Sequence, residues 1–473
     1  NLPSFLRDGQ IDADGNYITK SMNGKSLGNG FTDPDGNFVG ASIDRKTYMD
    51  LYDAWTSRDN TTTQINWDAL YAANRANNIL NPNGTARYIQ ERRHNNIQEA
   101  MVSVNYQNTK VEHLKMTVGL EGKASWGTHY KTIDDLLGAN QWIDIDPFAE
   151  RDIAELAENA KMTQTEMALV KQNNVKLDKN GNIQDPKSIT GTKTHFGYDY
   201  GMNIANIKAW FQNEWNWHDI DLYYAIAVNY SSMQRTTNML NGRAVYQAML
   251  QAHNNPEWAN YYAELYLGQQ ATDIMKNGVL VKTLNHYTGF RHNFVDPAFK
   301  AGFNYKINGR NHLKFNALAM TQAPLATNAY ISQRVHDRAV PTIYTHDHAK
   351  NIKDYFAASE KIVGGDLTYE FNYPIVRGRV TGFYSRFWGG TKLNSFYDDE
   401  ARTFVNQAIT GINRRHCGIE AAAAFKLGTY FTLTPVISIG DYRYTSNAYS
   451  VTSAENGMAL GYSNPAETEG SVM

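Results

Sequence analysis

Two neighbouring stretches between Phe299 and Met320 alternate between apolar and polar side chains. In the first, every odd position from Phe299 to Ile307 is apolar, and the even positions carry Lys, Gly or Asn. The second resumes at Leu313 and keeps an apolar residue at each odd position through Ala319. A period of two is typical of a β-strand that has one apolar and one polar face.

A short turn joins these two stretches into a β-hairpin. Cross-strand partners share a face, so the two apolar rows meet only across a loop with an odd number of residues. A three-residue turn at 308–310 meets this condition and places Phe303 opposite Phe315. By the same rule, Tyr305 lies opposite Leu313. Each strand is about 10 residues long, which suits a tilted strand that crosses a membrane.

The same pattern recurs in four further pairs of stretches. They cover residues 100–120, 194–230, 363–388 and 417–444. Together the five pairs predict about ten antiparallel strands, paired as chain neighbours, within residues 97–446. The expected fold class is all-β.

The lengths of the connections indicate which all-β fold this is. Turns within hairpins are short, whereas the linkers between hairpins, 127–193, 236–296, 324–360 and 391–413, are long. Outer-membrane β-barrels alternate short periplasmic turns with long extracellular loops, and compact soluble domains rarely carry several loops above about 15 residues. We therefore expect a transmembrane antiparallel β-barrel with long extracellular loops, located in the bacterial outer membrane.

Aromatic residues gather beside the short turns. They are Tyr106, Trp215, Trp217, Tyr223, Tyr224, Tyr305, Phe371, Tyr373, Tyr430 and Phe431. Tyr and Trp favour the boundary between lipid and water, because one end of the ring system is apolar and the other forms hydrogen bonds. The pattern favours an aromatic girdle over its alternative, the core of a soluble sheet.

Residues 1–96 and 447–473 flank the strands and are expected to be extracellular loop regions. Helical spacing of apolar residues predicts short helices at Asp44–Trp55 and Trp67–Ile79. Three segments, 12–16, 33–37 and 178–182, share an Asp or Asn followed by Gly. A calcium loop would place glycine at position 6 and glutamate at position 12, so turns explain these segments better.

The remaining chemistry argues against several other functions. The net charge of −2 is unlike that of an electrostatic nucleic-acid binder. No run of 18 apolar residues predicts a transmembrane helix, and the lone Cys417 forms no internal disulfide. His346 and His348 lack further placed ligands, so a solvated loop is preferred to a metal site. We expect no cofactor, no metal and no enzyme activity.

Several motifs connect this sequence to a known family. They are Tyr130–Gly138 followed by Ile143–Asp152, Ala323–Tyr330, Ser395–Asp399, Arg414–Glu420 and Ser438–Tyr444. Together they resemble the TonB-dependent receptors of Bacteroidota outer membranes. The resemblance covers residues 87 to 446, which is most of the chain. The motifs characterise one branch of a family and not a substrate.

The resemblance implies a barrel of about 22 strands with a plugged lumen. It also implies that the partners are outer-membrane lipid and the TonB energy-transducing system, reached through the plug, and it allows a surface lipoprotein. The chain departs from the family in having about ten strands and no recognisable plug domain or TonB-contact segment. We expect a slice of a larger barrel that begins and ends in extracellular loops; a barrel closed by ten strands is the alternative.

The family resemblance favours energised import of a nutrient, with a passive porin or a structural barrel scaffold as the alternative. Loop side chains that could stack on a polar nutrient or hydrogen-bond to it are Trp142, Trp258, Tyr261, Tyr262 and Asn328. For these five residues, packing of one loop against another is the competing interpretation.

Overall fold

The computed structural model describes most of the chain from residue 45 onwards and a few short segments before it. The described residues are 10–11, 17–18, 31–32, 38–39, 42–43, 45–58, 60–81, 85–146, 162–267, 271–283, 286–330, 358–398, 403–454 and 459–463.

One large antiparallel sheet dominates the molecule. Its strands are β6 (Gln90–Asn108), β7 (Leu114–Asp135), β10 (His195–Asn216), β11 (Ile220–Thr237), β14 (Tyr287–Asn308), β15 (Asn311–Gln322), β16 (Glu360–Asn372), β17 (Val376–Asp398), β18 (Thr403–Leu427), β19 (Phe431–Leu433), β20 (Val436–Tyr444), β21 (Tyr449–Ala454) and β22 (Ala459–Ser463). Strands from β6 to β18 pair in chain order, and β19, β20 and β21 all pair with β18. This confirms the expected all-β class.

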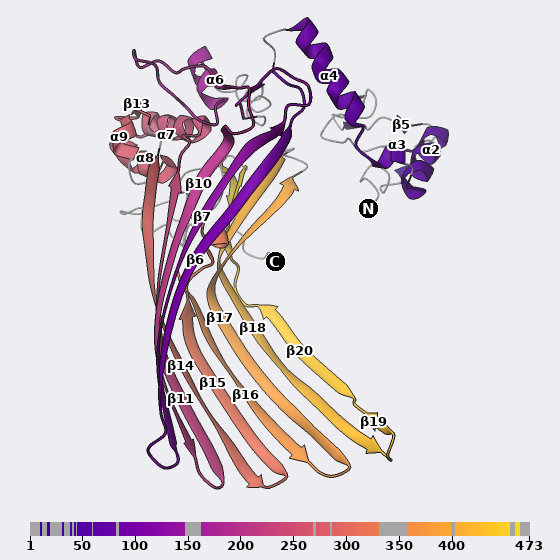
Figure 1. Cartoon of the computed structure of the whole chain (residues 1–473), viewed down its shortest axis with the longest axis vertical. Helices are drawn as coiled ribbons and strands as arrows, with labels where there is room; N and C mark the ends of the chain where they lie inside the picture. Colours follow the sequence, from indigo (N-terminus) through magenta and orange to yellow (C-terminus); the bar gives the residue numbers. More distant parts are fainter. Residues whose placement is uncertain are drawn as a thin grey trace.

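The sheet is an open wall in the part of the chain that the structure describes. Its path runs from β6, which pairs only with β7, to β22, and no pairing joins these two ends. Figure 1 shows the wall as a tall, curved sheet, with the short turns at one end and the loop helices at the other.

The hairpin of β14 and β15 has the register that its sequence predicts. Phe303 pairs with Phe315 and Tyr305 pairs with Leu313. In the turn, the side-chain oxygen of Asn308 accepts hydrogen bonds from the backbone N–H groups of residues 310 and 311, both at 3.0 Å. The short polar side chain therefore closes the turn and holds the two apolar rows in alignment.

The expected long linker at 391–413 is wrong. Strands β17 and β18 continue through most of it, and only residues 399–402 connect them. The register shifts on both sides of Gly390, and Gly389 and Gly411 have positive φ angles of 73° and 74°. Such irregularities interrupt the period of two while the strands stay paired. The alternation in the sequence therefore stops at a point where the two strands continue.

Near Gly389 and Gly411, where the register shifts, side chains replace backbone pairing. We call this the irregular level. The amide oxygen of Asn413 accepts a hydrogen bond from the Gly389 N–H at 3.0 Å. The hydroxyl oxygen of Ser446, which lies between β20 and β21, accepts from the Asn413 N–H at 3.0 Å and donates to the Gly411 carbonyl at 2.9 Å. These contacts satisfy backbone groups that the ladder leaves free.

Two of the loop regions fold together at the far end of the wall. Their elements are α6 (Gln164–Val170), α7 (Gly242–Asn254), η1 (Pro256–Trp258), α8 (Ala259–Leu267), α9 (Ala271–Ile274), β12 (Met275–Lys276) and β13 (Val279–Leu280). Leu169 and Val170 of α6 form one buried cluster with Leu240 and Val245. We call this cluster the loop core. Gly242 faces the Leu169 carbonyl with no room for a Cβ atom, so α6 and α7 approach closely.

The N-terminal helices lie where the sequence predicts them, as α2 (Arg45–Thr56) and α4 (Trp67–Leu80), with the short helix α3 (Asn60–Thr63) between them. The turns at 12–16 and 33–37 lie outside the described residues. The turn at 178–182 is confirmed, because Asp178 Oδ1 accepts from the backbone N–H groups of residues 180 and 182 at 2.7 and 2.9 Å. No described helix is long and apolar enough to cross a membrane.

Candidate functional site

The long strands present two chemically different faces. Through successive pairings, Phe303 and Phe315 lie in one row with Leu367, Ile419 and Ile439. Phe303 is half-buried, and the other four side chains remain exposed, Leu367 by 48% and Ile419 by 58%. We call this surface the apolar face. An exposed apolar band that continues over many strands marks a membrane-facing surface.

The opposite surface, the polar face, carries hydrogen-bonded side chains. The Tyr223 hydroxyl donates to Asn316 Oδ1 at 2.8 Å, and Asn316 Nδ2 donates to Asp366 at 3.0 Å. Lys314 contacts Glu370 at 2.6 Å on the neighbouring strands. Tyr223 was expected in the aromatic girdle, and that assignment is wrong because it pairs with Gly302 on the polar face.

Other aromatic residues do surround the short turns on exposed positions. Tyr106, Tyr305 and Tyr373 have exposed fractions of 59%, 44% and 40%. Tyr430 and Phe431, at the turn before β19, are exposed by 91% and 72%. These rings lie where the apolar face ends, which is the position of an interfacial girdle.

A hollow of about 880 Å³ opens on the polar face and forms the candidate site. Its walls come from β10, β11, β14 and β15, and residues 322–326 line it beside the end of β15. Asn206, Lys208 and Lys300 supply polar groups, and Trp210 supplies an aromatic surface. A pocket with an aromatic surface and a few polar groups is suited to a polar organic ligand.

A buried carboxylate fixes the segment beside the hollow. Asp296 is 3% exposed, and its two oxygens accept from the Thr321 hydroxyl and the Ala323 N–H, each at 2.9 Å. Because both donors lie at the end of β15, the Asp296 side chain orients the chain as it leaves the sheet.

An arginine and two tyrosines lie above the hollow, towards the loops. The Arg235 guanidinium is 4.3 Å from the centre of the Tyr200 ring and 5.8 Å from that of Tyr330. Arg235 and Tyr330 are 3% and 6% exposed. Sequence reasoning missed this arrangement, since the register of β10 and β11 brings Tyr200 close to Arg235, and Tyr330 comes from the segment after β15.

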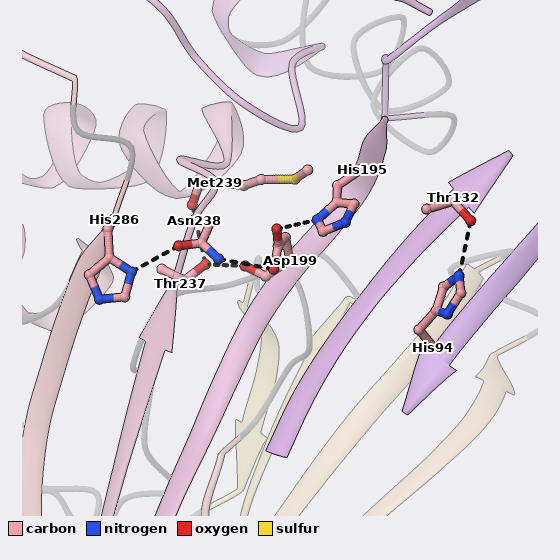
Figure 2. A network of polar contacts seen from close by, with 8 residues as sticks. All are labelled: His94, Thr132, His195, Asp199, Thr237, Asn238, Met239 and His286. Atoms are coloured by element: carbon pink, nitrogen blue, oxygen red, sulfur yellow. Dashed lines mark hydrogen bonds and ion pairs between the residues drawn. The ribbon is translucent and has the colours of Figure 1, made fainter. Parts of the chain in front are cut away.

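A polar network fastens the bases of the loops (Figure 2). Asp199 Oδ2 lies 2.6 Å from His195 Nδ1, and its other oxygen accepts from Asn238 Nδ2 at 3.1 Å. Asn238 Oδ1 lies 2.8 Å from His286 Nδ1, and the Thr237 hydroxyl donates to the Asp199 carbonyl at 3.0 Å. The network links the start of β10 with the end of β11 and the approach to β14, so its role is to hold the loop exits in register.

Ring stacking extends this region to β6 and β7. The Tyr130 ring lies between those of His94 and His195, with centroid distances of 4.4 and 4.0 Å. His94 Nε2 also lies 3.0 Å from the Thr132 hydroxyl (Figure 2). No group of three or more metal-ligating side chains occurs among the described residues. His346 and His348 lie outside them.

The five loop residues expected to contact ligand lie in separate places. Tyr262 is in the loop core, 8% exposed, and Trp258 packs against it. Trp142 packs against the cluster formed by Ile133, Ile189 and Phe196. Asn328 Oδ1 accepts from the Leu393 N–H at 3.3 Å. The side chain of Tyr261 lies outside the described part of the chain. A role of these residues in ligand binding stays a prediction.

No protein-family model and no curated protein match this chain. Solved structures that resemble it include the copper transporter OprC, with 9% identity over 76% of this chain and 42% of that chain and a TM-score of 0.42. The ferric yersiniabactin uptake receptor FyuA from Yersinia pestis has 10% identity over 77% of this chain and 40% of that chain, with a TM-score of 0.35. The ferric-catecholate import receptor Fiu from K12 E. coli has 10% identity over 76% of this chain and 42% of that chain, with a TM-score of 0.37. The chain spans less than half the length of these structures.

Proposed function

We propose that this chain forms part of the wall of a bacterial outer-membrane barrel that imports a nutrient by energised, TonB-dependent transport. The observation that carries the proposal is the two-faced sheet, with its exposed apolar rows, its hydrogen-bonded polar face and its short turns gathered at one end. A membrane barrel needs a lipid-facing surface and a polar lumen.

The hollow on the polar face is where we expect the passing nutrient to bind. Its aromatic and amide side chains suit a ligand that is held by stacking and hydrogen bonds. Trp142, Trp258, Tyr261, Tyr262 and Asn328 remain candidates for the loop surface that first captures the ligand. The TonB system, a plug, a surface lipoprotein and the Bacteroidota branch are further parts of this proposal and rest on the sequence motifs.

Uptake by cells tests whether the import is energised. A strain that depends on the intact receptor for one labelled nutrient should lose uptake when an uncoupler removes the proton-motive force. It should also lose coupled uptake when the plug of the intact receptor is deleted. Uptake at full rate under the uncoupler would reject the proposal and favour a passive porin. If no nutrient is found whose uptake falls when the receptor is deleted, a structural scaffold would be favoured.

A matched pair of tryptophan variants tests the hollow. Trp210→Ala removes the aromatic wall and should lower uptake at limiting nutrient. Trp217→Ala removes a ring beside a short turn, where 42% of the side chain is exposed, and should leave uptake unchanged. Equal uptake by the two variants would rule out the hollow as the binding site.

A further inference from the structure

The apolar face carries a group of charges at one place. Arg386 of β17 pairs with Arg415 of β18, which pairs with Arg443 of β20. Paired residues point to the same side of a sheet. Arg415 also shares its face with Ile419, since the two lie four positions apart on one strand. The three arginines therefore belong to the apolar face and not to the lumen.

Lys361 extends the group onto a fourth strand. It pairs with Trp388, which lies two positions beyond Arg386 on the same face. The Arg386 guanidinium lies 5.0 Å from the centre of the Trp388 ring. Adjacent strands β16, β17, β18 and β20 thus each contribute one cation, and we call Lys361, Arg386, Arg415 and Arg443 the cationic patch.

The distance from the short turns places the cationic patch at one boundary of the membrane. Arg386 lies ten residues after Val376, where β17 starts. Arg415 lies twelve residues before Leu427, where β18 ends. A strand that rises about 3.3 Å per residue and tilts by about 40° gains about 25 to 30 Å over this length. The apolar band of a barrel is about 25 Å tall, so the cations reach the outer headgroup level.

Other strands carry no charge on the apolar face at a comparable distance from their turns. The corresponding residues are Gln98, Ala124, Ala205, Tyr230, Pro297 and Thr321. The cations are therefore not explained by a general increase in polar residues towards the loop ends of the strands. They are confined to four adjacent strands, where they face the same layer of lipid.

The patch keeps an excess of positive charge after its internal ion pairs are counted. Asp441 contacts Arg415 at 2.7 Å and Arg443 at 2.6 Å, and it is the carboxylate that these two arginines share. Arg443 remains 68% exposed, so its guanidinium is open to an external anion. One carboxylate cannot neutralise four cations, so the surface is complementary to an anion.

We propose that the cationic patch binds the phosphate groups of a phosphorylated glycolipid in the outer leaflet of the membrane. Guanidinium groups form paired hydrogen bonds to phosphate oxygens, and exposed Tyr384 and Ile419 contact the acyl chains below them. Asp441 holds Arg415 and Arg443 in fixed orientations for that contact. This inference rests on the membrane placement of the apolar face and is independent of import.

The test measures lipid binding by the full-length protein purified from outer membranes. The probes are diphosphoryl lipid A, the same lipid without its phosphates, phosphatidylglycerol vesicles and inorganic phosphate. Arg386→Gln with Arg443→Gln removes two cations and leaves the Arg415–Asp441 pair. We expect binding of diphosphoryl lipid A at least tenfold weaker, since each basic residue near an anionic membrane surface changes binding about fivefold.

Arg377→Gln with Arg379→Gln is the matched control, because these β17 arginines pair with Asn372 and Glu370 on the polar face. The control should bind lipid A as the wild type does. Unchanged binding by the patch variant, an equal loss in the control, or equal binding of the dephosphorylated lipid would overturn the proposal. Equal affinity for inorganic phosphate or for phosphatidylglycerol would overturn the glycolipid as the ligand.

Two further measurements keep the result interpretable. If the patch variant does not fold, lipid A binding by the wild type is titrated with salt; binding should weaken steeply, and salt-independent binding would overturn the proposal. Nutrient uptake is measured in the same cells. If the wild type binds lipid A but its nutrient uptake does not depend on the proton-motive force, the import proposal is rejected and the lipid proposal stands.

Discussion

The two ends of a single strand show how differently the two halves of this wall are stabilised. In β11, Ile226 and Val228, in the part towards the short turns, are exposed by 49% and 45%. Further along the same strand, Ser232 and Gln234 on that same face are only 2% and 8% exposed, and Met233 and Arg235 on the opposite face are both 3% exposed. In the half towards the short turns, hydrophobic side chains are exposed. In the half towards the loops, even an arginine side chain is buried.

This difference reflects two surroundings. In the turn half of the proposed barrel, backbone pairing holds the strands and lipid covers the apolar side chains, so the protein needs no core there. In the loop half, water surrounds the protein, and side chains from distant segments must cover one another as in a soluble domain. One set of strands is therefore continuous through two environments with opposite rules for burial.

Labelling at the surface of intact cells gives the largest effect, because the result is all or none. Tags inserted near Asn182 and Asn255 should be labelled without permeabilisation, since both lie in the loop half that we place outside the cell. A tag in the β14–β15 turn at Gly309 should be labelled only after the outer membrane is opened. The reverse pattern would invert the orientation.

Leu240→Ala tests the soluble character of the loop half. Leu240 is fully buried in the loop core, and a truncated buried leucine costs about 2 to 5 kcal/mol through lost contacts and the cavity left behind. Faster proteolysis and amide exchange within 162–280 should report the loss. Leu250→Ala, at a position 37% exposed, is the control and should change little. Similar costs for both would argue against a packed core.

Phe303→Arg tests the lipid-facing character of the turn half. Arginine on the lipid side near the middle of the bilayer costs about 2 to 4 kcal/mol. Asn304→Arg is the matched control, because Asn304 lies on the polar face and donates to Asp221 at 3.0 Å. Unfolding in detergent and in bilayers should separate the two variants. Equal costs would refute the assignment of the faces.

Asn241→Ala should have a smaller effect on the loop half. The side-chain oxygen of Asn241 caps α7 by accepting from the N–H groups of Arg243 and Ala244 at 3.0 and 3.1 Å. Loss of such a cap costs about 1 kcal/mol. Amide exchange of the first turn of α7 should accelerate, whereas Asn255→Ala, beyond the end of that helix, should leave that turn unchanged.

The smallest effect concerns the pH dependence of the turn at 178–182. Hydrogen bonds from the backbone N–H groups of Asn182 and its neighbours lower the pKa of Asp178 below its usual value. The stabilisation is therefore complete above the usual value of about 3.9 and is lost as the pH falls through the lower, folded pKa. Proteolysis of this turn should increase in that acidic range. Asp178→Asn should abolish the pH dependence, and Lys179→Ala should keep it.

Local patterns in the sequence predicted much of the sheet and little of the site. The partners of Phe303 and Tyr305 could be predicted because a turn of known length fixes them. The extent of β17 and β18 could not, because the irregularities near Gly389 and Gly411 interrupt the alternation.

The loop core and the cationic patch were beyond reach for another reason. Leu169 and Leu240 belong to different loops, and nothing in either segment specifies the other. Likewise, Arg386, Arg415 and Arg443 are scattered in sequence, and only the register across β17, β18 and β20 aligns them. Long-range contacts of this kind depend on how whole elements pack.

The irregular level that crosses β17 at Gly389, β18 at Gly411 and the junction of β20 and β21 also has a mechanical meaning. A regular ladder resists bending because each hydrogen bond is aligned with the next, whereas the bulges in the β17–β18 pair bend these two strands and increase their local twist. This part of the wall therefore contains a crease. A force applied to the upper strands would be absorbed as a change of angle at the crease, while the strands below keep their alignment.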